Sequence, residues 1–192
     1  MAQPVLHTER LVLEPLRDEH LELEVELDAD PEVLRYLWGR ARDRDEVATS
    51  HLKRIALGRE IAGLGYWMAF LRDETHDFAG LMMLSQAHGP DRPDDPAVAE
   101  LGYRIPKHHW RKGYASEASR ELLRHAFQSV GMARVIAQTM AVNEGSRAVM
   151  SKVGLRYVRT FHPHFDDPLP GTEQGEVEYA ITREEWARPT VD

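Results

Sequence analysis

The sequence predicts an α+β fold, in which helices cover the faces of a single mixed β-sheet. Its 192 residues suffice for one sizeable core and are few for two, so we expect one domain spanning residues 1–192. An apolar content of 42% and a charged content of 29% are ordinary for a globular chain. The elements predicted below follow in the order β, α, α, β, β, β, α, β, α, β, β, which differs from the strict alternation of a doubly wound fold.

The first three elements are a strand and two helices. Residues 8–16 (TERLVLEPL) place Leu11 and Leu13 on the same face of an extended chain, and a proline closes the strand. Residues 18–29 carry spaced apolar side chains in a charged background and predict a helix that stops near the following proline. Residues 43–60 predict a second helix, because apolar and small residues repeat at helical spacing.

The middle of the chain reads as strands. Residues 66–71 and 78–84 are apolar and aromatic and are separated by a polar turn, which predicts a hairpin. Residues 89–96 (GPDRPDDP) form a loop rich in proline and aspartate. Residues 98–105 (VAELGYRI) predict a further strand, which Pro106 ends because it lacks a backbone donor.

The last third begins with an amphipathic helix. Residues 116–130 place their apolar side chains on one stripe, and Gly131 suits a left-handed cap. The remaining predicted elements are a strand at 133–142, a helix at 144–153, strands at 155–161 and 176–182, and a closing turn at 183–186.

Composition excludes several classes of function. Because the chain has no cysteine, it has no disulfide, no thiolate zinc site and no cysteine nucleophile. Its 24 basic and 32 acidic residues give a net charge of −8, which argues against a nucleic-acid partner and mildly favours a cationic substrate. No apolar run is long enough to cross a bilayer and the start lacks a signal-like core, so we expect a cytoplasmic protein without a membrane partner.

The stretch HHWRKGYASEA, residues 108–118, directly precedes the helix at 116–130 and has the composition of an anion site. A helix start presents unpaired N–H groups and the positive end of the helix dipole. Gly113 lets the backbone approach a phosphate closely, Ala115 keeps the next approach open, and Arg111 and Lys112 add positive charge. Alternatively, the glycine only makes a turn and the basic side chains only face solvent. Walker and dinucleotide-binding patterns are absent.

Three segments together, VAELGYRI, WRKGYASEA and NEGSRAVMSKVGL, resemble the GNAT superfamily of N-acetyltransferases, particularly the branch similar to RimJ and RimL. In the family pattern Q/R-x-x-G-x-G/A, Gly113 and Ala115 match the last two positions, and Trp110 takes the first, as the Rim-type branch tolerates. The resemblance implies a twisted, mostly antiparallel sheet of about seven strands flanked by about four helices and splayed between strands 4 and 5, at 98–105 and 133–142. It implies transfer of the acetyl group of acetyl-CoA to a primary amine.

The resemblance also implies a role for each matched residue. The acetyl-CoA contacts it implies are Tyr103, Ile105, Arg111, Lys112, Gly113, Tyr114, Ala115, Ser116 and Asn143. Glu100 would be the general base, directly or through a water, unless it only pairs with Arg104 on the same strand face. Ser146 would be the acid for the leaving thiolate, because Met150 stands where many members carry a proton-donating tyrosine.

The acceptor amine is left open. By resemblance, Trp38 and Phe161 wall the acceptor side, and a protein N-terminus, a polyamine, an amino acid or an aminoglycoside would all suit an acidic slot. His162 and His164 invite a metal site, but the proline between them and the lack of other spaced ligands favour a loop edge, so no metal is predicted. The alternatives are an inactive regulatory module that binds coenzyme A and a protein-interaction domain. Rim-type relatives suggest a homodimer.

Overall fold

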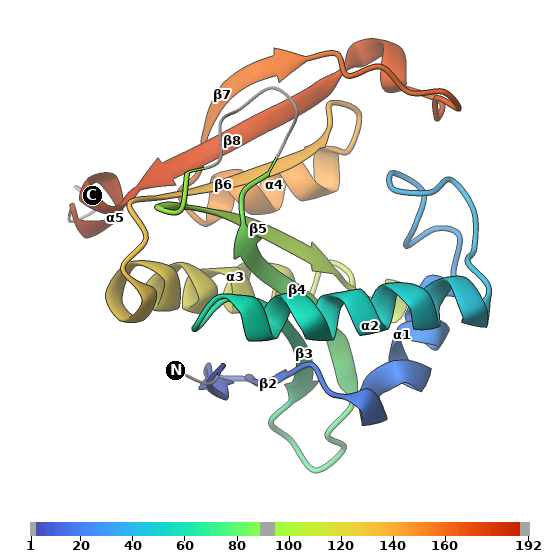
Figure 1. Cartoon of the computed structure of the whole chain (residues 1–192), viewed down its shortest axis with the longest axis horizontal. Helices are drawn as coiled ribbons and strands as arrows, with labels where there is room; N and C mark the ends of the chain where they lie inside the picture. Colours follow the sequence, from blue (N-terminus) through green and yellow to red (C-terminus); the bar gives the residue numbers. More distant parts are fainter. Residues whose placement is uncertain (1–2, 89–94, 189–192) are drawn as a thin grey trace.

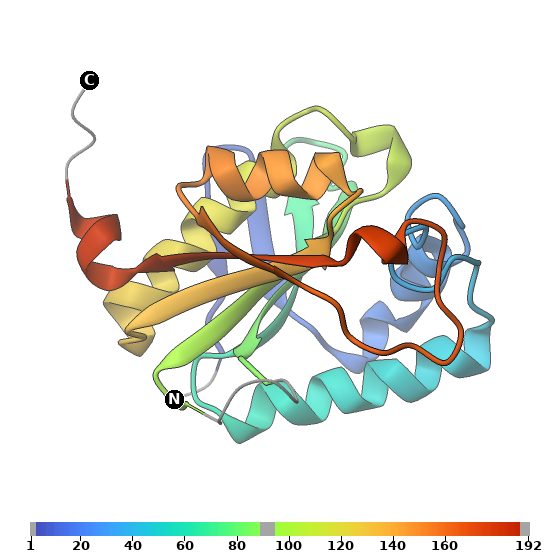
Figure 2. The same cartoon turned by 90° about the horizontal axis from the view of Figure 1, so that it is seen from above.

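The predicted α+β architecture is confirmed in a computed structural model, which describes residues 3–88 and 95–188. One open sheet carries helices on both faces (Figures 1 and 2). Its strands are β1 Leu6–His7, β2 Leu11–Pro15, β3 Gly65–Leu71, β4 Phe78–Gln86, β5 Val98–Arg104, β6 Arg134–Met140, β7 Arg156–Phe161 and β8 Glu176–Thr182. The α-helices are α1 Leu21–Asp28, α2 Arg44–Glu60, α3 Tyr114–Arg124, α4 Glu144–Lys152 and α5 Arg183–Ala187.

The described sheet has the strand order β1-β2-β3-β4-β5-β6-β8-β7. All neighbours are antiparallel except β5 and β6, which run parallel and pair only from Val98–Glu100 to Arg134–Ile136. Beyond Glu100 the two strands separate. The splay predicted between residues 98–105 and 133–142 is therefore confirmed, and the strand beyond the expected seven is the two-residue β1.

Two hydrophobic clusters lie on opposite faces of the sheet. Leu11 and Leu13 are fully buried in the larger cluster, where they meet Leu122 and Leu123 of α3. Burying each such side chain contributes roughly 1.5–3 kcal/mol. The other face packs against α1 and α2, and Figure 2 shows these two helices on the side opposite α3 and α4. The predicted strand at 8–16 is shortened, because Thr8 forms a turn in which its Oγ1 accepts from the N–H of Leu11.

The predicted helix at 18–29 is divided and buries charge. A 3₁₀ turn at Asp18–His20 precedes α1, which buries Glu24, Leu27 and Asp28 on one stripe. The sequence analysis described the acidic residues of this helix only as a charged background to its apolar side chains. Their burial is explained by arginine partners from α2, β5 and the segment before α2.

Helix α3 differs from its prediction at both ends. It begins at Tyr114 and not at Ser116, directly after Gly113, whose φ of 86° is left-handed. Residues 125–130, predicted as ordinary α-helix, are wound as a π-helix. The cap at Gly131 is confirmed, with φ of 90°.

Candidate active site

Strand β5 presents different side chains to its two faces. Leu101 packs in the large cluster beneath α3, so by alternation Glu100, Gly102 and Arg104 face the side of α1 and α2. The Arg104 guanidinium on this face donates to Asp28 of α1, so Arg104 has a buried carboxylate partner on that helix. Glu100 thus stands at the point where β5 leaves β6.

The loop after β5 reaches α3 through two left-handed residues. Arg111 has φ of 60° and Gly113 has φ of 86°. The first main-chain hydrogen bond of the helix runs from the N–H of Glu117 to the carbonyl of Gly113, at 3.0 Å. In the part of the chain that the structure describes, no group accepts from the N–H of Tyr114, Ala115 or Ser116. These donors are therefore available to an anion at the positive end of the helix.

The loop is held from outside by a residue that the sequence interpretation missed. Arg10 donates from Nη1 to the carbonyl of Lys112 at 3.0 Å and from Nε to Glu117 at 2.7 Å, and its guanidinium lies 4.7 Å from the centre of the Tyr114 ring. Burial disfavours ionisation of Glu117, but hydrogen bonds from Thr8 and Arg10 outweigh it and lower the pKa of that carboxyl. No sequence pattern signals this brace, because Arg10 and Glu117 are 107 positions apart.

The other predicted coenzyme residues around the loop have identified surroundings. The carbonyl of Ile105 accepts from the indole of Trp110 at 2.7 Å. The side chains of Arg111 and Lys112 are exposed, and Lys112 Nζ lies 3.4 Å from Nδ1 of the buried His109. His109 therefore fills the turn beneath the loop.

Tyr103, Asn143 and Ser146 meet on the face of the sheet opposite Glu100. The Tyr103 hydroxyl donates to the carbonyl of Ser146 at 3.0 Å and lies 3.1 Å from the Ser146 hydroxyl. Asn143 caps α4, since its Oδ1 accepts from the N–H of Ser146 at 3.2 Å, and its amide donates to Thr139 at 3.0 Å. Burial raises the pKa of Tyr103 to about 12, despite its contact with Ser146. The tyrosine therefore keeps its proton at neutral pH.

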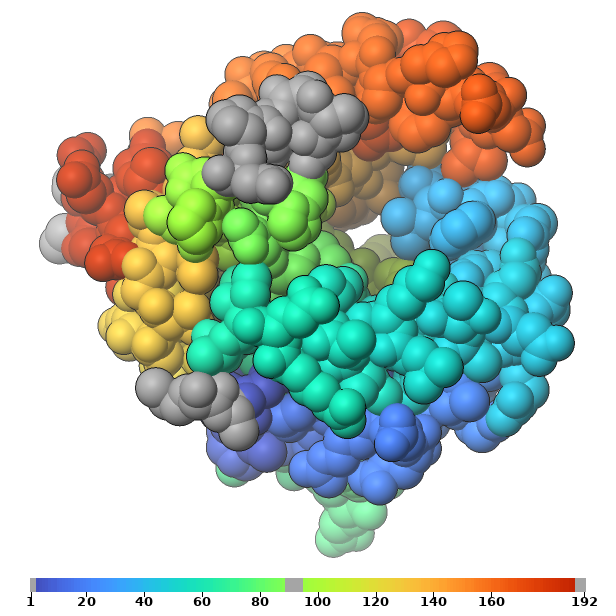
Figure 3. Space-filling view, viewed as in Figure 1, coloured from blue at the N-terminus to red at the C-terminus, as the bar shows by residue number. Residues whose placement is uncertain are grey.

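The predicted acceptor residues belong to two segments that lie far apart in the sequence. Trp38 is 49% exposed on the segment between α1 and α2, and strand pairing puts Phe161 on the sheet face that carries Glu100. Figure 3 shows the surface hollowed between α2, the segment after α1 and the part of the chain coloured orange. The walls touch each other, because a Cβ on Gly39 would lie 2.5 Å from Leu169.

Glu176 is a further residue of this face that the sequence interpretation did not single out. It opposes Phe161 on β7 and Met140 on β6, and no hydrogen bond or ion pair of its side chain occurs among the described residues. Burial raises its pKa to about 7. The available signal was an acidic residue alternating with apolar ones in EVEYAIT.

Neither a metal site nor a membrane span emerges from residues 3–88 and 95–188. No three histidine, aspartate or glutamate side chains there are grouped so that they would hold a metal ion. None of the helices in that part is both long and apolar enough to cross a membrane. The predicted loop at 89–96 lies mostly outside the described residues.

Comparisons with known proteins agree with this arrangement. The family model described as an acetyltransferase (GNAT) domain matches residues 10–156. The FsC-acetyl coenzyme A-N(2)-transacetylase of Aspergillus fumigatus is 42% identical over 190 residues, covering 97% of this chain and 80% of the relative.

Solved structures support the fold. A GNAT-family acetyltransferase from Bacillus anthracis superimposes with a TM-score of 0.76 at 22% identity, over 94% of this chain and 99% of the other. Mycobacterium smegmatis RimJ, solved with a CoA-disulfide, gives a TM-score of 0.71 at 21% identity over 93% and 84% of the two chains. Fold, family model and relatives agree: the chain belongs to the GNAT family and is an acetyl-CoA-dependent N-acetyltransferase.

Proposed function

We propose that this enzyme transfers the acetyl group directly to a primary amine while both substrates are bound. The observation that carries the proposal is the end of β5–β6 pairing at Glu100, which opens the sheet beside the predicted base. The N–H groups at the start of α3 that have no acceptor follow the C-terminal end of β5. Phe161, a predicted acceptor residue, lies on the sheet face that carries Glu100. Acetyl-CoA would then enter from the α3 side and the amine from the α2 side.

In this proposal the α3 loop binds the pyrophosphate of acetyl-CoA. The N–H groups of Tyr114, Ala115 and Ser116 supply three donors without protein partners, and the left-handed Gly113 turns the backbone toward the anion. Each charge-assisted hydrogen bond contributes about 1.5–3 kcal/mol. Amides of β5 beyond Glu100 would pair with the pantetheine arm as an added strand and polarise the thioester carbonyl.

The transfer itself needs a neutral amine. An alkyl ammonium with a pKa near 10.4 is mostly protonated at pH 7, so Glu100 accepts its proton, directly or through a water. The amine nitrogen then bonds to the carbonyl carbon and releases its second proton to solvent, the C–S bond breaks, and the thiolate of coenzyme A leaves. The acetylated amine and free coenzyme A are the products.

The leaving thiolate would be met by Ser146 and Tyr103. A thiol has a pKa of about 8.5, so proton transfer from a tyrosine whose pKa is about 12 is uphill. Tyr103 therefore acts by fixing the Ser146 side chain, whose hydroxyl lies 3.1 Å away, so that this hydroxyl donates a hydrogen bond to the sulfur, and the thiolate takes its final proton from solvent.

The acceptor is proposed from the relative's name. That protein acts on FsC at a nitrogen designated N(2), and it is 42% identical over nearly the whole of this chain. By the usual locant rule, N2 is borne by carbon 2, which in an amino acid is the α-amino position. We therefore propose an amino-acid-derived acceptor with a free N2 amine.

A thiol-release assay with acetyl-CoA tests both levels of the proposal. The panel contains amino-acid derivatives with a free N2, the same compounds with N2 blocked, N-terminal peptides, polyamines and aminoglycosides. Release with the free N2 compounds and not with their blocked forms is expected. Thiol release with N-terminal peptides alone would overturn the proposed amino-acid-derived acceptor. Binding of acetyl-CoA without thiol release for any amine would overturn the proposed acetyl transfer.

A further inference from the structure

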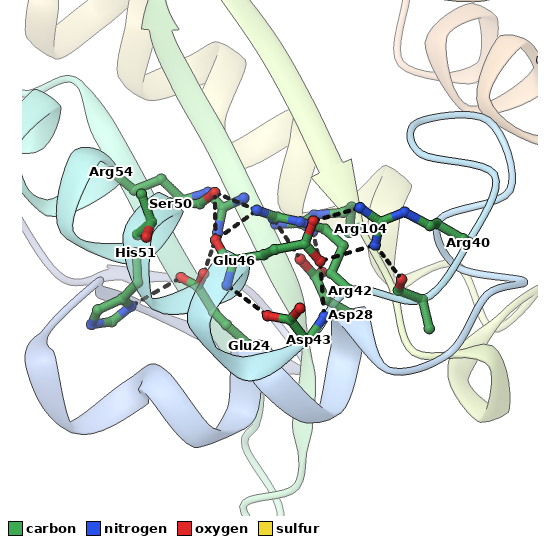
Figure 4. Close-up of polar contacts among 12 residues, drawn as sticks. Glu24, Asp28, Arg40, Arg42, Asp43, Glu46, Ser50, His51, Arg54 and Arg104 are labelled. Carbon is green, nitrogen blue, oxygen red and sulfur yellow. Dashed lines mark hydrogen bonds and ion pairs between the residues drawn. The ribbon is translucent and has the colours of Figure 1, made fainter. Parts of the chain in front are cut away.

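Asp28 joins three segments of the chain in one buried ion cluster (Figure 4). Its side chain is fully buried at the end of α1. One carboxylate oxygen accepts from Arg104 of β5, and the other accepts from Nη1 of Arg42 at 3.1 Å. Arg104 belongs to β5 and Arg42 to the segment between α1 and α2 that also carries Trp38.

Arg42 is itself fixed by several bonds. Its backbone N–H donates to the carbonyl of Asp28 at 2.9 Å, and Nη2 donates to the carbonyl of Glu46 at 2.7 Å and to the hydroxyl of Ser50 at 2.6 Å. Its guanidinium lies 4.6 Å from the centre of the Trp38 ring. The exposed Trp38 therefore rests on an arginine whose position depends on Asp28.

Simple stabilisation is a weak explanation for this arrangement. Burying an ion pair costs desolvation that the attraction between the charges repays only in part, and an apolar replacement is often as stable. What the pair provides is geometry, because a carboxylate bridging two guanidinium groups fixes both in direction and distance. Here it fixes the segment bearing Trp38 against the strand bearing Glu100.

We propose that Asp28 is a positioning residue that sets the Trp38 wall of the acceptor site relative to β5. The inference rests on the proposed acceptor site and goes beyond it, since Asp28 lies in α1 and touches neither substrate. Loss of its charge would leave the coenzyme loop intact, because that loop is braced separately by Arg10. Amine binding would weaken while acetyl-CoA binding stays unchanged.

Glu24 supplies a matched control. It lies one turn before Asp28 on the same helix and is equally buried, and it accepts from Arg54, while its Oε1 lies 3.4 Å from Nδ1 of His51. Both partners belong to α2, so this second pair ties helix to helix and reaches neither Trp38 nor β5. Glu24→Gln removes as much buried charge as Asp28→Asn without touching the proposed link.

The test compares steady-state constants of Asp28→Asn and Glu24→Gln in the full chain. We expect Asp28→Asn to raise the KM for the amine about tenfold and leave the KM for acetyl-CoA within about twofold. Glu24→Gln should change neither constant by more than about threefold, although its melting temperature falls similarly. A cycle with Trp38→Ala should be non-additive: the double variant raises the amine KM no further than the larger single effect.

The inference is overturned if Asp28→Asn and Glu24→Gln change the amine KM equally. It is also overturned if the effects of Asp28→Asn and Trp38→Ala on that KM are additive. If Asp28→Asn does not fold, Arg42→Lys decides, because it keeps the charge but loses the planar contact with Trp38. A raised amine KM in that variant supports the inference and an unchanged one overturns it. If the unmodified enzyme acetylates no amine, the proposed function fails instead, so the two failures are distinguishable.

Discussion

Alternation along β5 separates the two ends of the proposed reaction. Glu100 faces the side of α1 and α2, which is the proposed acceptor side, while Tyr103, three residues later, faces α4 and hydrogen-bonds to Ser146. In the proposed reaction, one strand therefore carries both the general base, Glu100, and the tyrosine that positions the Ser146 hydroxyl. The gap between β5 and β6 is where the two sides meet.

Replacing Glu100 by Gln tests the base. The change keeps the shape of the side chain and removes its capacity to accept a proton, so kcat at neutral pH should fall by about 10²–10⁴. The KM for acetyl-CoA should change little. Stopped-time assays from pH 6 to 10 measure this, and unaltered rates across that range would remove Glu100 as the base.

Removing the hydroxyl of Ser146 or of Tyr103 should lower kcat only modestly. A hydrogen bond contributes about 0.5–1.5 kcal/mol net, so Ser146→Ala and Tyr103→Phe should each lower kcat about tenfold or less. Because the two hydroxyls act as a unit, the double variant should be little slower than either single one. A loss near that of Glu100→Gln would show instead that Ser146 transfers the proton in the slow step.

The raised pKa of Glu176 implies that the stability of the folded chain depends on pH. Its folded pKa of about 7 lies above the ordinary 4.5, so the folded state holds the proton more tightly and stability falls as pH rises from about 4.5 to 7. Glu176→Gln should therefore melt higher than the unmodified chain at pH 8, by about 2–4 °C for roughly 1 kcal/mol, and not at pH 4. Melting curves at both pH values check this. A difference that is the same at both would contradict it.

At the scale of elements, sequence patterns predicted much of the framework. Apolar runs and alternation predicted every strand of five residues or more, and the glycine before α3 and the cap at Gly131 were predicted because their backbone requirements are local. What was missed depends on distant partners. Buried Glu24 and Asp28 look like solvent-facing residues until their arginines are known, and Arg10 has no local reason to reach Lys112.

The start of α3 can be tested with two glycines. Gly113→Ala puts a side chain into a left-handed position and 3.3 Å from Arg10, so the KM for acetyl-CoA should rise about tenfold. Gly131→Ala bears a similar backbone strain, at φ of 90°, but its new carbon lies 3.8 Å from the nearest atom and far along the helix. Gly131→Ala should lower the melting temperature and leave the KM for acetyl-CoA unchanged. Equal KM changes in both variants would argue against the loop as the coenzyme site.

At the scale of the whole molecule, the sheet formed by residues 3–88 and 95–188 consists of two parts that share three residue pairs. Strands β1 to β5 form one part and β6, β8 and β7 the other, joined at Val98–Glu100 and Arg134–Ile136. A ligand lying in the gap contacts both parts. The homodimer and the cytoplasmic location expected from the sequence stay predictions, and sedimentation tests the former.

Coenzyme A should therefore stabilise the entire chain. At about 100 times its Kd, a ligand that binds only the folded state adds about 2.7 kcal/mol, or roughly 5–10 °C in a domain of this size. Thermal melting measures the shift, and hydrogen exchange should show new protection of the amides at 101–104. No shift would favour a protein-interaction domain over a coenzyme site.

The contact between Gly39 and Leu169 bears on which molecules the enzyme accepts. It joins the segment after α1 to the loop after β7, so the hollow in Figure 3 is rimmed on all sides instead of lying open as a trench. In the proposed reaction, the amine would have to enter through this rim to reach Glu100.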